Sequence, residues 1–258
     1  MEQSLKARLR GGRPANGFWV ELFSPAAAEI MAAAGYDCAM IDLEHGAADL
    51  GDAVAVMRAM AASPCTPLVR VPANDPAWVK RVLDAGAAGV MIPAVNNAAE
   101  AEAAVAACHY PPRGFRGMAA PIVRAANYGV GWQDYVAEVR RSVLTICQVE
   151  TREAVEKAAE IAAVPDLDMI FIGPFDLSGS LGHLGEPDHP DVRAAIARVE
   201  AAAKAAGVLL GAIPTPARSV QSLYADGYDL VLVDSDLGFV RDGARASVAA
   251  LREAAGRR

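Results

Sequence analysis

The sequence predicts an α/β fold in which eight parallel strands close into a (β/α)8 TIM barrel, preceded by a short N-terminal helix. Eight short apolar segments alternate with helix-like segments, which is the pattern of a parallel sheet covered by helices on both faces. The chain has 258 residues, and barrels of this type use about 250 residues as one domain. An open doubly wound sheet is the alternative, but no G-x-G-x-x-G motif follows the first strand, which argues against dinucleotide binding. We therefore expect a single barrel domain over residues 1–258.

The first half of the chain supplies four predicted strands and the helices that follow them. The strands are short apolar runs, expected at 17–23, 36–42, 66–71 and 88–92. The helices are expected at 25–34, 49–62, 75–85 and 97–109. Pro25 fits the first turn of its helix, where a missing backbone N–H costs nothing. A long connection begins at residue 110 and leads to a helix at 131–141.

The second half of the chain repeats the same alternation. Its strand-like segments are 143–150, 167–176, 208–213 and 228–233, and Asp176 lies just beyond the apolar run of the second segment. The helices are expected at 151–164, 191–206 and 216–225, and the C-terminal segment is also expected to be helical. The segment after Asp176 is rich in glycine, so it is expected to be a loop.

Composition excludes several classes of protein. With 24 basic and 31 acidic residues, the net charge is −7, and no basic stripe is present, so we expect no nucleic-acid partner. The first residues lack the apolar core of a signal peptide, and no apolar run reaches the roughly 18 residues of a membrane helix. We expect a cytoplasmic protein without a membrane partner. The four cysteines form no C-x-x-C pair and are expected to be buried thiols rather than disulfides, zinc ligands or nucleophiles.

Two predicted strands each end in a carboxylate. Glu150 ends the strand at 143–150, and Asp176 follows the next one. The C-terminal ends of consecutive parallel strands lie on one rim, so the two acids should meet there. Like charges at close range repel unless a proton or a cation lies between them, and oxygen ligands suit Mg²⁺ or Mn²⁺. The alternative is local: Glu150 would cap a helix, and Asp176 would form an Asx turn or an N-cap.

A histidine follows the second predicted strand. Asp42 and Glu44 are two positions apart, so they would share one side of an extended backbone, and His45 follows them into a loop. A histidine beside carboxylates can be held in one tautomer and act as a base near neutral pH. A solvated polar loop is the alternative. The other three histidines, at a helix end or in a polar loop, are expected to have surface roles.

Arg70 lies inside the third predicted strand. A guanidinium in an apolar strand is costly unless it is paired, either by an internal carboxylate or by the carboxylate or phosphate of a ligand. We favour the ligand. Arg116, flanked by glycines, is either a second anion contact or a loop anchor. Asp84 lies at a helix C-terminus, where its charge opposes the helix dipole, so we expect it to have a partner other than a local cap.

Lysines argue against one class of enzyme. The four lysines all lie in polar helix-like segments, and none ends a strand: Lys6, Lys80, Lys157 and Lys204. A Schiff-base enzyme needs a desolvated lysine inside its site. The sequence therefore disfavours Schiff-base chemistry.

Six segments of the chain, taken together and in order, resemble the HpcH/HpaI family of class II pyruvate aldolases. This family includes 4-hydroxy-2-oxoheptanedioate and 2-dehydro-3-deoxyglucarate aldolases. The segments are DCAMIDLEHG at 37–46, LVRVP at 68–72, LDAGAAG at 83–89, YPPRGFRG at 110–117, QVE at 148–150 and FIGPFDLS at 171–178. The resemblance extends from about Leu5 to the last strand.

The resemblance implies roles for these residues. Glu150 and Asp176 would bind a divalent cation, Mg²⁺, Mn²⁺ or Co²⁺, while Arg70 would hold pyruvate and steady its enolate. His45 would be the base, acting through a metal-bound water. The other implied site residues are Asp42 near His45, Asp84 from a neighbouring subunit, and Gln148, Gly173 and Pro174 lining the pyruvate pocket.

The resemblance also implies an assembly and a reaction. Family members are usually hexamers, or trimers of dimers, that exchange C-terminal helices. We expect reversible cleavage of a 4-hydroxy-2-oxo acid to pyruvate and an aldehyde. The alternatives are an oxaloacetate decarboxylase using the same enolate chemistry and a non-catalytic binder of 2-oxo acids. Phe175 and Phe115 stand where related aldolases often have smaller residues, and both are expected to narrow the acceptor pocket.

Overall fold

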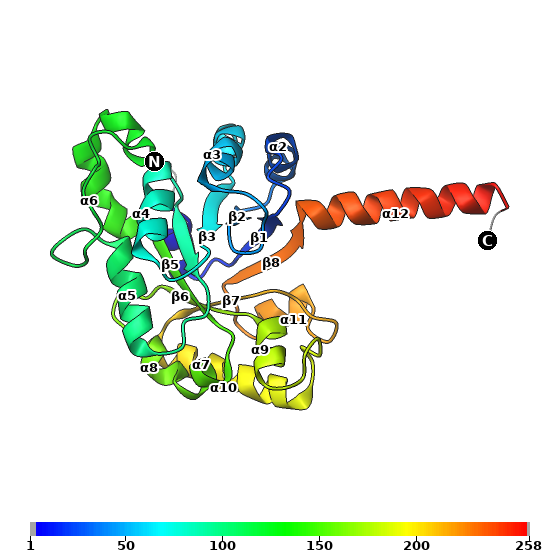
Figure 1. Cartoon of the computed structure of the whole chain (residues 1–258). Coiled ribbons are helices and arrows are strands. Elements are labelled where there is room, and N and C mark those ends of the chain that lie inside the picture. The colour runs from blue at the N-terminus through cyan, green and yellow to red at the C-terminus, as the bar shows by residue number, and fades with distance from the viewer. Residues whose placement is uncertain (1–3, 257–258) are drawn as a thin grey trace.

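The computed structural model describes residues 4–256, and eight parallel strands within this range form a closed barrel (Figure 1). Each strand pairs with the next one along the chain, and the last strand pairs with the first. This closure confirms the predicted (β/α)8 TIM barrel and excludes the open sheet. The strands are β1 Ala15–Val20, β2 Cys38–Asp42, β3 Thr66–Arg70, β4 Gly89–Ile92, β5 Leu144–Val149, β6 Met169–Ile172, β7 Leu209–Ala212 and β8 Leu230–Ser235.

Helices surround the barrel and mostly begin where a side chain caps them. Ser24, Asp49, Asp75, Asn97 and Thr151 each accept a hydrogen bond from a backbone N–H in the first turn of the following helix. The longer helices are α2 Pro25–Ala33, α3 Leu50–Ala59, α4 Pro76–Ala85, α5 Ala98–Cys108, α6 Trp132–Ser142, α10 Pro190–Ala206 and α12 Asp236–Ala254. The shorter ones are α1 Leu5–Arg10, α7 Arg152–Glu156, α8 Ala158–Ala162, α9 Pro174–Ser180, α11 Val220–Ala225, and the 3₁₀ segments η1 Met60–Ala62 and η2 Arg124–Gly129.

The structure differs from the predicted elements in the second half of the chain. The helix expected at 151–164 is two short helices, because the backbone at Lys157 (φ −103°, ψ 13°) leaves the helical region while both halves still bury one face on the barrel. The loop expected after Asp176 begins later than predicted: α9 starts at Pro174 and includes Asp176 in its first turn, and the loop follows at 181–189. The helix expected at 216–225 begins at Val220, after a short bridge between Thr215 and Arg218.

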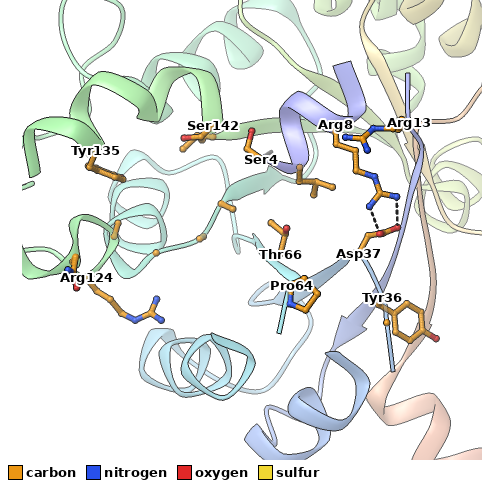
Figure 2. Close-up of a pocket in the computed structure, with 18 of the residues that line it drawn as sticks. Ser4, Arg8, Arg13, Tyr36, Asp37, Pro64, Thr66, Arg124, Tyr135 and Ser142 are labelled. Carbon is orange, nitrogen blue, oxygen red and sulfur yellow. Dashed lines mark hydrogen bonds and ion pairs between the residues drawn. The ribbon is translucent and has the colours of Figure 1, made fainter. Parts of the chain in front are cut away.

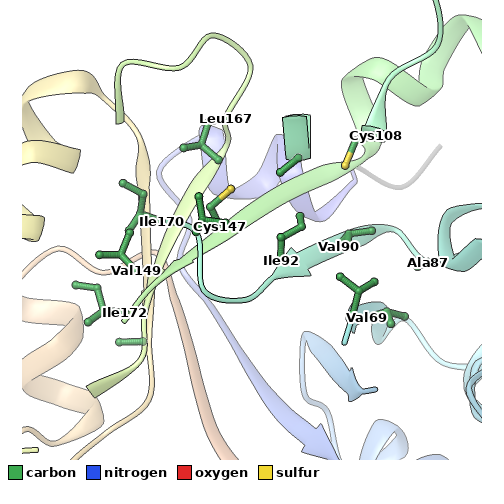
Figure 3. Packing of buried hydrophobic residues seen from close by; sticks show 14 of the residues in the cluster. Val69, Ala87, Val90, Ile92, Cys108, Cys147, Val149, Leu167, Ile170 and Ile172 are labelled. Atoms are coloured by element: carbon green, nitrogen blue, oxygen red, sulfur yellow. The ribbon is translucent and has the colours of Figure 1, made fainter. Parts of the chain in front are cut away.

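Two apolar layers hold the barrel together. Alternate strand residues such as Leu68, Met91 and Ile146 fill the barrel interior, where they meet Leu5 and Leu9 of α1. The residues between them face the helices, and Figure 3 shows Val90, Ile92, Cys147, Val149, Ile170 and Ile172 in this outer layer. All four cysteines are buried and free, which confirms their predicted structural role.

Helix α1 closes the barrel at the N-terminal ends of the strands. Asp168, just before β6, is buried and accepts a hydrogen bond from the backbone N–H of Thr145 at 3.0 Å. The same carboxylate pairs with Lys6 at 2.8 Å and with Arg10 at 3.2 Å, both on α1. These ion pairs fix the N-terminal helix beneath the barrel.

Helix α12 leaves the barrel and projects away from it (Figure 1). Its start is anchored by buried Asp236, which accepts hydrogen bonds from the backbone N–H groups of Glu21 and Leu22. Large apolar side chains are exposed along the helix: Leu237, Phe239, Val240, Val248 and Leu251. Among the described residues, no helix is both long and apolar enough to cross a membrane.

Candidate active site

Adjacent strands β5 and β6 bring Glu150 and Asp176 to the same rim of the barrel. Val149 pairs with Ile172, so the residues that follow both strands begin at the same level. Glu150 accepts hydrogen bonds from the backbone N–H of Ala94 at 2.8 Å and from the Gln148 amide at 2.9 Å. Neither acid has the alternative capping role, because Thr151 caps α7 and no side chain caps α9.

Glu150 is a buried acid with further acids close to it. Its side chain is only 6% exposed, and burial raises its pKa to about 7. The negative charges of Asp176 and Glu44 raise this pKa further, while the hydrogen bond from Ala94 and the charge of Arg70 lower it. A divalent cation between Glu150 and Asp176 would remove the repulsion between the two carboxylates.

The surroundings of Glu150 fit a hard cation. Gly173 lies against its carboxylate, and a Cβ at this position would approach the Glu150 Oε2 atom to 2.5 Å. The amide oxygen of Gln148 is buried and, within residues 4–256, has no hydrogen-bond partner. Carboxylate and amide oxygens are the donors that Mg²⁺ and Mn²⁺ prefer. The residues present therefore suit a divalent ion with open positions for a ligand.

Arg70 is paired inside the protein, contrary to the expectation that a ligand satisfies it. Its Nε and Nη2 groups donate to the two oxygens of buried Asp42 at 2.9 and 2.7 Å, and Nη1 lies 3.0 Å from Glu44. The register that places Asp42 beside Arg70 across β2 and β3 produces this fork. The guanidinium also lies 4.6 Å from the ring centroid of Trp19, so its plane is fixed.

His45 follows β2 and lies near Glu44. Its Nε2 atom is 4.0 Å from a Glu44 carboxylate oxygen, and its side chain is 65% exposed. The Asp42 carboxylate accepts hydrogen bonds from the backbone N–H groups of Glu44 (3.0 Å) and His45 (3.4 Å). Asp42 therefore supports both the arginine fork and the loop that carries the histidine.

One cavity of about 680 Å³ brings most of the predicted site residues together. The predicted residues that line it are His45, Arg70, Gln148, Gly173, Pro174 and Asp176. Asp84 lies away from it, because α4 runs back to the N-terminal ends of the strands. There Asp84 accepts a hydrogen bond from Arg116 at 2.6 Å, so it has a local partner, and Arg116 is a loop anchor.

The two phenylalanines have different positions. Phe175 lines the cavity and is partly exposed there, as expected. Phe115 follows α5 and does not line the cavity of its own chain, so its predicted role at the pocket mouth is wrong within one subunit. The sequence interpretation also missed residues that the ends of β1 and β8 and the start of α12 bring to this cavity: Trp19, Glu21, Asp234, Phe239, Arg241 and Asp242.

A larger cavity, of about 1070 Å³, lies at the opposite end of the barrel (Figure 2). It is lined by the start of β3 and by residues just before β2, β4 and β5, and by Arg8, whose guanidinium pairs with Asp37. Arg124 in this cavity donates to the backbone oxygen of Ala85 at 2.7 Å. The paired carboxylates of the rim have no counterpart among its lining residues.

A histidine cluster lies in the loop between α9 and α10. Within residues 4–256, His183, His189 and Asp191 are the one group of three such side chains close enough to share an ion. However, the two imidazole rings are stacked 3.5 Å apart at an angle of 15°. Ring nitrogens coordinate in the plane of the ring, so two stacked rings do not converge on one cation. We assign this cluster to loop structure, where His189 caps α10.

Comparison with known proteins agrees with this geometry. The family model described as HpcH/HpaI aldolase/citrate lyase matches residues 15–244. A hydroxypyruvate/pyruvate aldolase of Chromohalobacter salexigens is 41% identical over 237 residues, covering 90% of this chain and 91% of the relative. A 4-hydroxy-2-oxo-heptane-1,7-dioate aldolase of Salmonella paratyphi C is 38% identical, covering 96% and 94%. The crystal structure of an HpcH/HpaI aldolase/citrate lyase family protein from Burkholderia cenocepacia superposes with a TM-score of 0.91 at 42% identity, covering 97% and 100%.

Proposed function

The chain belongs to the HpcH/HpaI aldolase/citrate lyase family, and on that premise we propose how its site works as a metal-dependent pyruvate aldolase. The enzyme is a carbon–carbon lyase that cleaves 4-hydroxy-2-oxo acids reversibly to pyruvate and an aldehyde. One observation carries the assignment of the site. Glu150 is a buried carboxylate with a raised pKa, and it interacts electrostatically with Asp176 and Arg70 at the end of the barrel where such enzymes react.

Glu150 and Asp176 would hold a divalent cation, Mg²⁺, Mn²⁺ or Co²⁺. When bound, the cation supplies Lewis-acid stabilisation of the negative charge that develops on pyruvate as a proton leaves its C3 carbon. With only two protein carboxylates as ligands, such a cation would remain accessible to oxygen atoms of the substrate. Gln148, Gly173 and Pro174 would form the wall of the pyruvate pocket beside these ligands.

Arg70 would hold the pyruvate half of the substrate. A guanidinium has five N–H donors, and three of them are used by Asp42 and Glu44. The remaining donors are fixed in direction and are free to bind an anionic oxygen facing the cavity. Because the fork is held before substrate arrives, little ordering is needed at the moment of reaction.

His45 would move the proton between C3 of pyruvate and the solvent side of the cavity. Its imidazole lies near the Glu44 carboxylate, with 4.0 Å between Nε2 and the nearest oxygen, and a positioned base typically contributes about 10²–10⁴-fold. In the synthetic direction, C3 loses a proton and bonds to the aldehyde carbon, and the aldehyde oxygen takes up a proton. The step needs neither an oxidant nor a reductant.

Turnover with and without a chelator tests this function. We expect pyruvate to be released from 4-hydroxy-2-oxo acids, with EDTA abolishing activity and Mg²⁺ or Mn²⁺ restoring it. Oxaloacetate is the matched alternative substrate: faster turnover of oxaloacetate than of every aldol substrate would make the enzyme a decarboxylase. A non-catalytic binder would show no exchange of the pyruvate methyl protons in D₂O. Activity that persists in EDTA would contradict the proposed mechanism.

We also propose a homo-oligomer, a hexamer or trimer of dimers, in which α12 is exchanged between barrels. One feature supports it: the exposed apolar side chains of α12. Light scattering tests it, since Val248→Asp with Leu251→Asp should lower the mass of the particle, whereas Glu253→Gln should not. An unchanged mass for the double variant would overturn the role of α12. A cytoplasmic location stays a prediction from the sequence.

A further inference from the structure

Part of the lining of the active-site cavity comes from β1 and β8, and β1 lies across the barrel from β5, the strand before Glu150. The end of β1, the end of β8, the start of α12 and α9 each contribute to it. We call this region the acceptor half, defined by Glu21, Phe175, Asp234, Phe239, Arg241 and Asp242. In the proposed reaction, pyruvate occupies the side with the two metal-binding acids, so the aldehyde must lie in the acceptor half.

The positive charge of Arg241 in the acceptor half is already paired with a carboxylate of the protein. Arg241 donates from Nε and Nη2 to the two oxygens of Asp242, at 2.7 and 2.9 Å. This is a two-point carboxylate pair, and both groups are solvent-accessible in it. An anionic aldehyde would have to compete with Asp242 for the arginine that faces it.

The two other acids of the acceptor half have no such pairing. Within residues 4–256, no basic side chain lies within salt-bridge distance of Glu21 or Asp234, although the Glu21 charge helps to raise the pKa of Arg241. Asp234 accepts only a long hydrogen bond from the Tyr36 hydroxyl, at 3.4 Å. The four charged residues of this region therefore sum to an excess of two negative charges, from one arginine and three acids. Carboxylates of this kind accept hydrogen bonds from hydroxyl groups and repel other anions.

We propose that the acceptor is a short, uncharged hydroxyaldehyde, and that Glu21 and Asp234 select it by repelling aldehydes that carry a carboxylate, phosphate or sulfonate. Hydroxyl groups of the acceptor donate to these carboxylates, and the rings of Phe175 and Phe239 limit its length. This inference rests on the proposed function, because it concerns the second substrate of the same site. Selection arises from a repulsive element rather than from a new attractive contact.

Matched pairs of aldehydes test the proposal with the full chain, saturating Mg²⁺ and pyruvate. The pairs are 4-hydroxybutanal with succinic semialdehyde, and glyceraldehyde with glyceraldehyde 3-phosphate. We expect kcat/KM for the neutral member to exceed that for the anion by about 10-fold to 100-fold at low salt. The ratio should shrink as salt is raised, since ions screen exposed charges. Equal values, or a preference for the anions, would overturn the proposal.

Charge-neutral variants locate the effect. Glu21→Gln combined with Asp234→Asn should reduce the neutral-to-anion ratio about 10-fold. The control is Glu102→Gln combined with Glu160→Gln, which changes the net charge equally at two exposed positions outside the cavity and should leave the ratio unchanged. Equal shifts in both double variants would assign selection to the net charge of the protein and overturn the role of Glu21 and Asp234.

Exchange of the pyruvate methyl protons in D₂O separates this proposal from the proposed function. Exchange needs no aldehyde, so it also reports that each variant is folded and loaded with metal. Exchange together with a neutral-to-anion ratio near one would reject the acceptor assignment alone. Absence of exchange in the unmodified enzyme would reject the pyruvate chemistry itself, and with it the need for an acceptor.

Discussion

Glu150 follows β5 at one end of the barrel, and Asp168 precedes β6 at the other, so one pair of strands holds two buried carboxylates that can be compared. Asp168 has two cationic partners on α1 and a backbone N–H. Glu150 has a backbone N–H and an amide, but its nearest charged neighbours include two further acids, which help to raise its pKa. The compensated acid ties α1 to the barrel, whereas the uncompensated acid is the one that we propose binds a cation.

Removing the uncompensated acid should have the largest effect on catalysis. We expect Glu150→Gln to lower kcat/KM by about 10³-fold, because a neutral amide binds a divalent cation poorly. In metal-free protein the same variant should be as stable as the unmodified chain or more stable above pH 7. Above pH 7, Glu150 is ionised in the folded state, and its buried charge lowers the free energy of unfolding. This destabilisation is absent below the pKa that Glu150 has in the unfolded chain, because the carboxyl is then protonated in both states. Steady-state kinetics and thermal unfolding measure the two effects. A Glu150→Gln variant with lower stability and full activity would show that Glu150 stabilises the fold and is not needed for catalysis.

Removing the compensated acid should do the opposite. We expect Asp168→Asn to lower the free energy of unfolding by about 3 kcal/mol, because Lys6 and Arg10 lose their common partner. Activity per folded molecule should be retained, since Asp168 lies at the far end of the barrel from the rim. Denaturant titration beside active-site titration checks this. A variant of normal stability but little activity would show that the two ends do not have separate tasks.

Gly173, which lies against the Glu150 carboxylate, allows a test of Glu150 as a metal ligand without changing Glu150 itself. Gly173→Ala would place a Cβ 2.5 Å from the Glu150 carboxylate, so this side chain must move and metal affinity should fall about 10-fold to 100-fold. Gly117→Ala is the control, because its Cβ would meet only the Lys80 side chain at an ordinary 3.5 Å. Calorimetric titration with Mn²⁺ measures both. Equal affinities in the two variants would mean that Glu150 is not a ligand.

The pH dependence of metal binding gives the mildest test. A cation requires the ionised carboxylate, so metal affinity should fall about tenfold for each pH unit below the Glu150 pKa of about 7. Binding at pH 6 should therefore release close to one proton, and at pH 8.5 close to none. Calorimetry in buffers of different ionisation enthalpy counts this proton. An affinity that does not change between pH 5.5 and 6.5 would contradict a raised pKa in the free site.

Sequence periodicity was sufficient to predict all eight strands, because most of them, such as β2, β5 and β6, are buried along their whole length and are therefore short apolar runs. It also predicted that Glu150 and Asp176 lie on one rim, since parallel strands end together. It did not reveal that α9 begins directly after β6, because Gly173 and Pro174 also suit a loop. Whether Glu150 and Asp176 bind metal stays a prediction.

Contacts between distant parts of the chain were beyond the sequence. The pair of Asp84 with Arg116 spans 32 residues and depends on how the connection after α5 folds back over α4. The sequence predicted that a ligand would pair with Arg70. Only the register of β2 and β3 shows that Asp42 lies opposite Arg70 and pairs with it. Glu21 and Asp234 come together because β1 closes on β8, which joins opposite ends of the sequence.

Helix α12 begins in the wall of the catalytic cavity, with Phe239 and Arg241 facing the substrate space, and its remaining turns extend beyond the barrel. Because one helix carries both the pocket residues and the distant turns, a displacement of its C-terminal end would shift the side chains that contact the aldehyde. Substitutions near Leu251, distant from all reacting atoms, are thus expected to alter which aldehydes react without altering pyruvate activation. Directed changes of substrate range need not begin at the pocket.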